Sequence, residues 1–206
     1  MLGLNYREML MSNKLIADTL ITFSRYLVYI ICFALGLIII QGILRLPKDI
    51  FRKLLHVAAF TSSIFVVLNG EGWLAEVLTL LIFALIVYPL LVMAEKWDFF
   101  TKLLTEKQPG ELPKSLLLLF VSQAILLAFS CGLLNKPYIL ITSTLAWGLG
   151  DIAAAWVGRP LGKHKIKLAI ADNKKSWEGS AAMLAVAFIA SVIALNIYSG
   201  YGFGNV

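Results

Sequence analysis

Charged residues are scarce in this sequence. Lys, Arg, Asp and Glu make up 15% of the 206 residues, whereas a soluble globular domain carries roughly 25%. Hydrophobic residues make up 60%, and they gather in uninterrupted runs close to the length of about 20 residues that an α-helix needs to cross a bilayer. The net charge is +6, but this composition excludes a soluble nucleic-acid-binding protein and indicates a membrane protein.

Cysteine is also nearly absent. The two cysteines, Cys32 and Cys131, both fall inside apolar runs. Neither a disulfide framework nor a thiolate metal site is therefore expected. We expect two buried thiols that pack as small hydrophobic side chains.

Six apolar runs are expected to cross the membrane as α-helices, because backbone groups in hydrocarbon must be hydrogen-bonded within the protein. These runs cover residues 26–44, 54–69, 74–94, 115–134, 138–157 and 180–198. The second is the shortest. Residues 6–22 are weakly amphipathic and predict an interfacial helix before the first span. The sequence thus predicts an all-α, polytopic integral membrane helix bundle, with residues 1–206 forming a single membrane domain.

The connections between these spans differ in basic charge. If the spans alternate in direction, one face carries only Arg7, Lys14, Arg25 and Lys136. The other fourteen Lys and Arg residues lie in the first, third and fifth connections. The positive-inside rule predicts that this second face is cytoplasmic. We expect a prokaryotic plasma membrane as the location, with both chain ends outside.

Several polar residues near the basic face are not explained by membrane insertion alone. Arg52 and Lys53 stand at the start of the second run, and His56 follows one turn later. They are either membrane anchors beside a packed polar residue, or part of a site for an anion. Asp151 lies about 10 Å inside its helix at the usual rise per residue. A carboxylate at that depth predicts a functional site, and pairing with a buried base is the alternative.

Two motifs belong to the fifth connection. The run Gly-Arg-Pro-Leu-Gly-Lys-His-Lys over residues 158–165 combines glycines and cations that can surround phosphate oxygens. Helix packing and binding of anionic lipid headgroups are the alternatives. The run Asp-Asn-Lys-Lys-Ser-Trp-Glu-Gly-Ser over residues 172–180 suits a polyphosphate and a divalent cation at a helix start. A plain helix start is the alternative.

Together these motifs resemble the integral-membrane CTP-dependent lipid kinases. That group includes phytol kinase, dolichol kinase and the CTP-dependent diacylglycerol kinase, and it is distantly similar to phosphatidate cytidylyltransferase. The resemblance extends over about residues 50–190 and rests on the order of Arg52-Lys53-x-x-His56, Gly150-Asp151 and the runs at 158–163 and 173–179. It implies transfer of the CTP γ-phosphate to the hydroxyl of a lipid alcohol, of the polyprenol, phytol or diacylglycerol type.

The resemblance also implies roles for single residues. Asp151 would hold Mg²⁺, with Glu178 as a second ligand, and His56 would position or deprotonate the alcohol. Basic and polar residues of the motifs would bind the triphosphate. The expected catalytic residues are Asp151, His56 and Lys175, and the expected phosphate-binding residues are Arg52, Lys53, Arg159, Lys163, Asn173, Lys174, Lys175 and Ser176.

Two other functions stay open at this point. Nucleotidyl transfer that forms a CDP-lipid is one, although the further Lys-Asp and Gly-Gly-Asp-Arg type signature of cytidylyltransferases is missing after residue 179. A transporter or non-catalytic membrane protein is the other, and the gathering of charges at one face argues against it. Kinases of this kind commonly continue with further spans, so a homodimer is one way to complete the lipid pocket.

Overall fold

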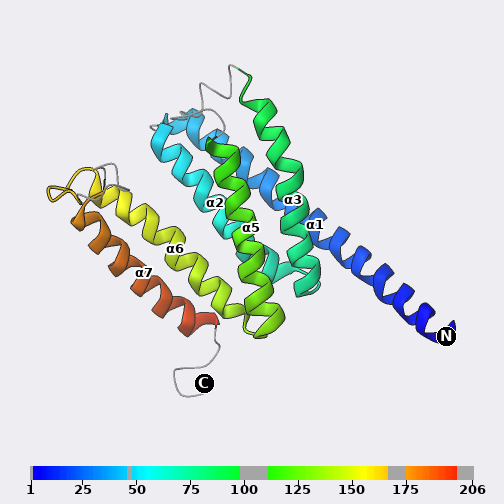
Figure 1. The fold of residues 1–206 in the computed structure, drawn as a ribbon. Coiled ribbons are helices and arrows are strands. Elements are labelled where there is room, and N and C mark those ends of the chain that lie inside the picture. The colour runs from blue at the N-terminus through cyan, green and yellow to red at the C-terminus, as the bar shows by residue number, and fades with distance from the viewer. Residues whose placement is uncertain (1, 46–47, 98–110, 167–174, 199–206) are drawn as a thin grey trace. The chain divides into compact units, whose positions relative to one another are not determined.

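All regular secondary structure in the described part of the chain is helical. The computed structural model describes residues 2–45, 48–97, 111–166 and 175–198. The helices, in order, are α1 (Leu2–Leu44), α2 (Lys48–Asn69), α3 (Trp73–Ala94), α5 (Glu111–Leu127), a short π-helix η1 (Ala128–Leu133), α6 (Pro137–Gly158) and α7 (Trp177–Tyr198) (Figure 1). Outside the helices, the same residues contain one isolated antiparallel bridge. The predicted all-α class is confirmed.

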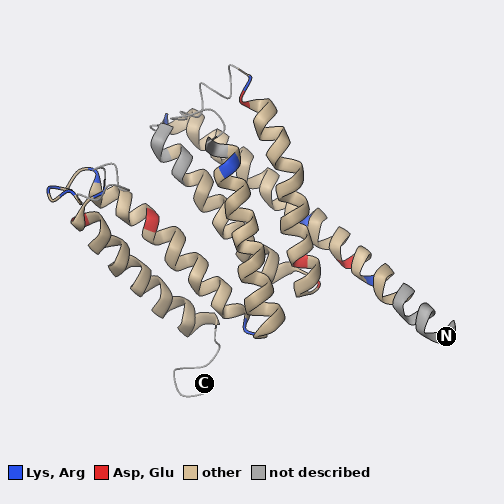
Figure 2. Ribbon diagram, viewed as in Figure 1, with Lys and Arg blue, Asp and Glu red and all other residues tan. Residues whose placement is uncertain are grey.

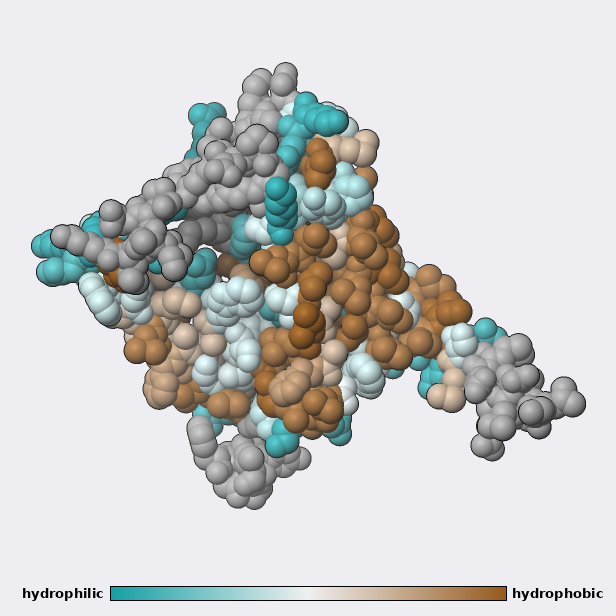
Figure 3. All heavy atoms as spheres, in the orientation of Figure 1, coloured by the Kyte–Doolittle hydropathy of each residue, from teal (hydrophilic) through white to brown (hydrophobic). Residues whose placement is uncertain are grey.

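In the described part of the chain, five helical segments are long and apolar enough to cross a membrane, one fewer than the six predicted spans. They are Leu10–Leu44, Trp73–Ala94, Pro113–Leu133, Pro137–Gly158 and Trp177–Tyr198. The apolar part of α2 is shorter, Leu54–Asn69, because the first turns of this helix carry cations. Hydrophobic residues cover much of the surface in Figure 3, as expected where lipid is the solvent. A polytopic helix bundle is thus confirmed, whereas the run predicted as the second span is shorter than the five spanning helices.

The N-terminal segment differs from the prediction of a separate interfacial helix. Residues 6–22 are helical, but they belong to a single 43-residue helix that continues through the first span. Such a helix is about 65 Å long, roughly twice the thickness of a hydrocarbon core. Neither proline nor glycine occurs between residues 4 and 35, so nothing in the sequence breaks the helix before the span begins.

Arg25 marks the level at which α1 passes the connection between α2 and α3. Its guanidinium donates a hydrogen bond to Glu71 Oε1 at 2.7 Å and another to the carbonyl oxygen of Asn69 at 3.0 Å. Nearby, the Thr22 hydroxyl accepts a hydrogen bond from the Glu71 backbone N–H at 3.3 Å. Residues 26–44 therefore form the part of α1 beyond this connection, and this part is about 28 Å long.

The chain divides into two compact units, residues 1–137 and 138–206. In the first unit, the ring of Tyr26 on α1 meets Phe83 on α3 edge-on at 4.9 Å, and Phe83 meets Phe120 on α5 at 5.1 Å. These rings join three helices in one core. The single membrane domain predicted for residues 1–206 stays a prediction.

Buried hydrogen bonds cross between helices in the same unit. The hydroxyl groups of Tyr26 and Ser62 are 2.9 Å apart, and the Ser63 hydroxyl donates to Gln123 Oε1 at 3.0 Å. All four side chains are buried. Hydrogen bonds of this kind contribute about 0.6 kcal/mol each between membrane helices, and they favour one packing of α1, α2 and α5.

Both cysteines are free thiols. Cys131 is half-buried, but Cys32 is exposed on α1, so the prediction of burial is wrong for Cys32. An apolar run has the same composition on its lipid-facing and protein-facing sides, because lipid tails and a protein core are both apolar. Composition alone therefore cannot place a thiol on one side.

In the second unit α6 and α7 run side by side (Figure 1), and small residues set their distance. A Cβ atom added to Gly150 would lie 3.2 Å from Met183 Cγ and 3.5 Å from Ala187 Cβ. A Cβ atom on Gly179 would lie 2.8 Å from the carbonyl oxygen of Ala154. Small residues allow two membrane helices to approach this closely.

Candidate functional site

The connection between α6 and α7 turns back against the start of α7. Lys165 and Ser176 form an antiparallel bridge. Beside it, the Ile166 N–H donates to the Lys175 carbonyl at 2.9 Å, and the Trp177 N–H donates to the His164 carbonyl at 3.0 Å. We call residues 158–166 together with 175–180 the α6–α7 turn. The two motifs predicted in the connection between α6 and α7 are thus held side by side.

Ser176 begins α7 as its N-cap residue. The buried Ser176 hydroxyl accepts a hydrogen bond from the Gly179 N–H at 3.2 Å, three residues ahead, which is the usual N-cap bond. The hydroxyl also lies 3.5 Å from the Gly158 carbonyl oxygen, to which it donates. This geometry supports the alternative to phosphate binding, in which Ser176 starts the helix. Its hydroxyl already accepts one hydrogen bond and donates another.

Three glycines surround Ser176. A Cβ atom on Gly162 would collide with the carbonyl oxygen of Gly158 and would lie 2.7 Å from Ser176 Cβ. A Cβ atom on Gly158 would lie 3.1 Å from Ser176 Oγ and 3.3 Å from the Cα of Gly179. Close packing, the alternative for the spacing of Gly158 and Gly162, is therefore what the structure shows: Gly158 packs against the start of α7, and Gly162 packs in the loop against Gly158 and Ser176.

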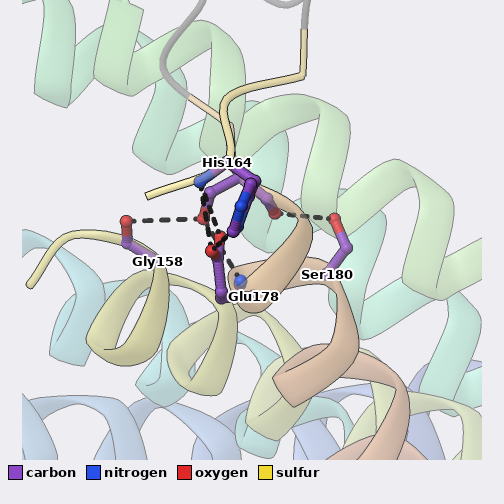
Figure 4. Close-up of polar contacts among 6 residues, drawn as sticks. Gly158, His164, Glu178 and Ser180 are labelled. Atoms are coloured by element: carbon purple, nitrogen blue, oxygen red, sulfur yellow. Dashed lines mark hydrogen bonds and ion pairs between the residues drawn. The ribbon is translucent and has the colours of Figure 1, made fainter. Parts of the chain in front are cut away.

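Glu178 and His164 make the strongest side-chain contact of the turn (Figure 4). The distance from His164 Nδ1 to Glu178 Oε1 is 2.7 Å. The backbone N–H of His164 donates to both carboxylate oxygens, at 3.1 Å to Oε1 and 3.3 Å to Oε2. Sequence reasoning missed this partner of Glu178, because fourteen residues separate the two and no periodic pattern relates them.

Asp151 lies deeper along α6, and its side chain is exposed. Its neighbour Gly150 packs beside Met183 on α7, five residues beyond Glu178. That spacing corresponds to about 8 Å along the helix axis. The register of the two helices therefore separates Asp151 from Glu178, the two residues that were expected to share a metal ion.

The described residues offer no group of three or more His, Cys, Asp or Glu side chains that could hold a metal ion. Mg²⁺ needs less, because it keeps several waters and binds through one or two carboxylates together with substrate phosphates. Asp151 alone fits that requirement. The Glu178 carboxylate, in contrast, already accepts hydrogen bonds from two nitrogen atoms of His164.

Four basic side chains of the turn are exposed. They are Arg159, Lys163, Lys165 and Lys175, and Figure 2 shows basic residues gathered on the loop at this end of α6. Asp151 is the only acidic residue in the otherwise apolar sequence of α6. The turn thus provides cations beyond the end of a helix that carries an intramembrane carboxylate.

The other predicted site residues lie outside the described residues or in the first unit. Asn173 and Lys174 lie outside the described residues, as do the side chains of Arg52 and Lys53. His56 is half-buried on α2, in the first unit, next to the packed residues Leu54 and Leu55. Their predicted roles stay predictions.

Sequence reasoning also missed Glu76, a buried carboxyl group in the first turn of α3. Its side chain lies against Gly70, where an added Cβ atom would collide with the carboxylate arm. The backbone N–H of Glu76 also donates a hydrogen bond to the Gly72 carbonyl oxygen at 3.0 Å. An acidic residue at the edge of an apolar run was the available signal. These contacts indicate that Glu76 packs against the α2–α3 connection and stabilises it.

No family model, no curated protein and no solved structure matches this chain. The geometry of the α6–α7 turn and the position of Asp151 are therefore the basis for a functional proposal.

Proposed function

We propose that this protein is a membrane lipid kinase that transfers the γ-phosphate of a nucleoside triphosphate, CTP by the sequence resemblance, to the hydroxyl of a lipid alcohol. The observation that carries the proposal is an intramembrane carboxylate, Asp151, on a helix that ends in a turn with four exposed cations. A lipid hydroxyl at the membrane interface and a nucleotide in water would meet between these two features.

In this proposal the cations of the α6–α7 turn bind the triphosphate. Phosphoryl transfer needs little covalent chemistry from the protein and depends on positioning and charge neutralisation. Lys175, Arg159 and Lys163 supply that positive charge, with Lys174, Asn173 and, from α2, Arg52 and Lys53 as predicted additions. Mg²⁺, when bound, would neutralise charge that develops on the phosphate oxygens, and Asp151 is the residue proposed to hold it.

The bond changes follow from the reaction class. The lipid oxygen forms a bond to the γ-phosphorus while the bond from that phosphorus to the bridging oxygen breaks, and CDP leaves. The proton of the alcohol goes to a base, for which His56 is the predicted candidate. We place the site at the cytoplasmic face, because nucleoside triphosphates are cytosolic and the positive-inside rule assigns the basic connections to that side.

The proposed acceptor is a long-chain alcohol of the polyprenol, phytol or diacylglycerol type, dissolved among the membrane lipids. A homodimer would be one source of additional walls for its pocket. A prokaryotic plasma membrane is the proposed location.

Phosphate transfer by the purified chain tests the proposal directly. The protein in detergent with Mg²⁺ is given γ-labelled CTP or ATP and a panel of diacylglycerol, phytol, farnesol and undecaprenol. We expect label in at least one lipid, dependence on Mg²⁺ and loss of label in Asp151→Asn. The matched control is Lys136→Gln, which removes an exposed charge outside the α6–α7 turn and should leave the transfer unchanged.

Parallel reactions with α-labelled CTP and phosphatidate distinguish the related chemistry. Label in the lipid from the α position, together with release of pyrophosphate, would replace the kinase with a nucleotidyl transferase. Folded protein that binds no nucleotide, or that moves an ion across liposomes without nucleotide, would contradict both and favour a transporter.

A further inference from the structure

We propose that Glu178 is a positioning residue that acts through His164, and not a metal ligand. In this inference Glu178 holds the basic loop, residues 159–166, against the start of α7, so that its cations face one bound triphosphate. The identity of the bound anion rests on the proposed function. The contact between Glu178 and His164 does not.

The geometry of the carboxylate supports this assignment (Figure 4). Both His164 donors converge on Oε1, Nδ1 at 2.7 Å and the backbone nitrogen at 3.1 Å, and the backbone nitrogen also reaches Oε2 at 3.3 Å. Each carboxylate oxygen therefore already receives a donor from the loop. A metal ion at Glu178 would have to share the carboxylate with a backbone N–H and an imidazole, and the first of these contacts fixes the path of the chain.

Helix register supports the same conclusion. Glu178 lies in the first turn of α7, where a carboxylate interacts favourably with the positive end of the helix dipole. Asp151, the other expected metal ligand, lies about 8 Å farther along the helix pair by the usual rise per residue. A single Mg²⁺ ion has ligand distances of 2.0–2.1 Å, so direct coordination by both carboxylates does not follow from this packing.

His164 stands between Lys163 and Lys165, so holding His164 also limits the positions of these two cations. The backbone pairing of His164 with Trp177 and of Ile166 with Lys175 continues the same attachment. A binding loop that is held in place before the ligand arrives loses less conformational freedom on binding. The contact should therefore strengthen triphosphate binding without entering the chemical step.

Glutamine provides the variant that separates the two roles. The single carbonyl oxygen of Gln at position 178 can take the place of Oε1 and accept both His164 donors, but it carries no charge for a metal ion. We expect Glu178→Gln to keep the KM for the nucleotide within about threefold of wild type. Glu178→Ala and His164→Ala should each raise it by up to about tenfold with little change in kcat, because the loop then loses conformational freedom when the nucleotide binds.

The double variant and the metal titration complete the kinetic test. Since Glu178→Ala already removes every contact between the two side chains and the loop backbone, Glu178→Ala combined with His164→Ala should be no worse than Glu178→Ala alone. The Mg²⁺ concentration for half-maximal activity should be the same in all these variants. Ser180→Ala is the matched control: Ser180 lies in the same turn of α7, and its hydroxyl contacts only the Ser176 carbonyl.

Amide hydrogen exchange of the full chain in detergent tests the contact without any nucleotide. Peptides that cover residues 159–166 should exchange faster in Glu178→Ala and His164→Ala, and as in wild type in Glu178→Gln and Ser180→Ala. Unchanged exchange in Glu178→Ala would overturn the inference. So would a loss of activity in Glu178→Gln as large as in Glu178→Ala with a higher Mg²⁺ requirement, because both results belong to a metal ligand. Failure of wild type to phosphorylate any lipid would remove the proposed function, while the exchange data would still decide whether Glu178 holds the loop.

Discussion

The close crossing of α6 and α7 makes a quantitative prediction for Gly179→Ala. The added Cβ atom would lie 2.8 Å from the carbonyl oxygen of Ala154 and 3.1 Å from the Cα of Gly158. Ordinary contacts begin at 3.4 Å, and both neighbours are backbone atoms that cannot rotate away. The helices must therefore separate by about 0.6 Å, the difference between 3.4 and 2.8 Å.

Overpacking of this kind costs about 1–3 kcal/mol. Alanine is favoured over glycine inside a helix by up to about 1 kcal/mol, which offsets part of the cost. We expect a net loss of about 1–2 kcal/mol in the free energy of unfolding. Gly36→Ala is the matched control, because no atom lies within 4 Å of the added Cβ there. It should leave stability unchanged or raise it by up to about 1 kcal/mol, the same helix preference.

The assay is reversible unfolding in mixed detergent and SDS micelles, followed by circular dichroism and by tryptophan fluorescence. The emission of the five tryptophans reports unfolding of the whole chain, and circular dichroism reports the loss of helix. Equal stability of Gly179→Ala and Gly36→Ala would refute the reasoning, because it would mean that the α6 and α7 backbones are not in contact at Gly179.

Three other measurements check independent parts of the structure. Asp151→Asn should lower phosphate transfer at least about 100-fold, as expected for loss of a group that stabilises transition-state charge, with unchanged helicity by circular dichroism. Tyr26→Phe removes the buried bond to Ser62 and should cost about 0.6 kcal/mol of stability, and no more than about 1.7 kcal/mol; a neutral result in SDS unfolding would remove that bond from the packing. In a cysteine-free background, Lys136→Cys and Lys163→Cys should react with an impermeant maleimide from opposite sides of sealed vesicles; labelling from the same side would contradict the alternating spans.

The helices could be predicted from the sequence because long apolar runs admit few structures in a bilayer. The ends of the last two spans agree closely with α6 and α7, where proline or a polar segment borders each run. The continuous α1 could not be predicted, because the weak amphipathic pattern of residues 6–22 suggested a separate element. Only the lack of a helix-breaking residue before Gly36 pointed to a single helix.

The candidate site was predictable in composition but not in its contacts. The motifs at residues 158–165 and 172–180 were both expected to bind the triphosphate, and the bridge between Lys165 and Ser176 joins them. The roles of Ser176 and Glu178 differ from expectation, because their side chains accept hydrogen bonds from backbone N–H groups. Sequence spacing shows which residue types are present, and it does not show which hydrogen-bonding groups are already satisfied.

The three glycines around Ser176 also affect how substitution data on this protein would be interpreted. A saturation scan would find that larger side chains are poorly tolerated at Gly158, Gly162 and Gly179, a profile usually assigned to residues that touch a ligand. Here the intolerance would come from the space between two helices and a loop, since an added Cβ atom would crowd Ser176 or another backbone atom at each position. The side chains of Arg159, Lys163 and Lys175 are exposed. Loss of activity on their substitution is therefore the more direct indicator of chemistry at this end of the protein.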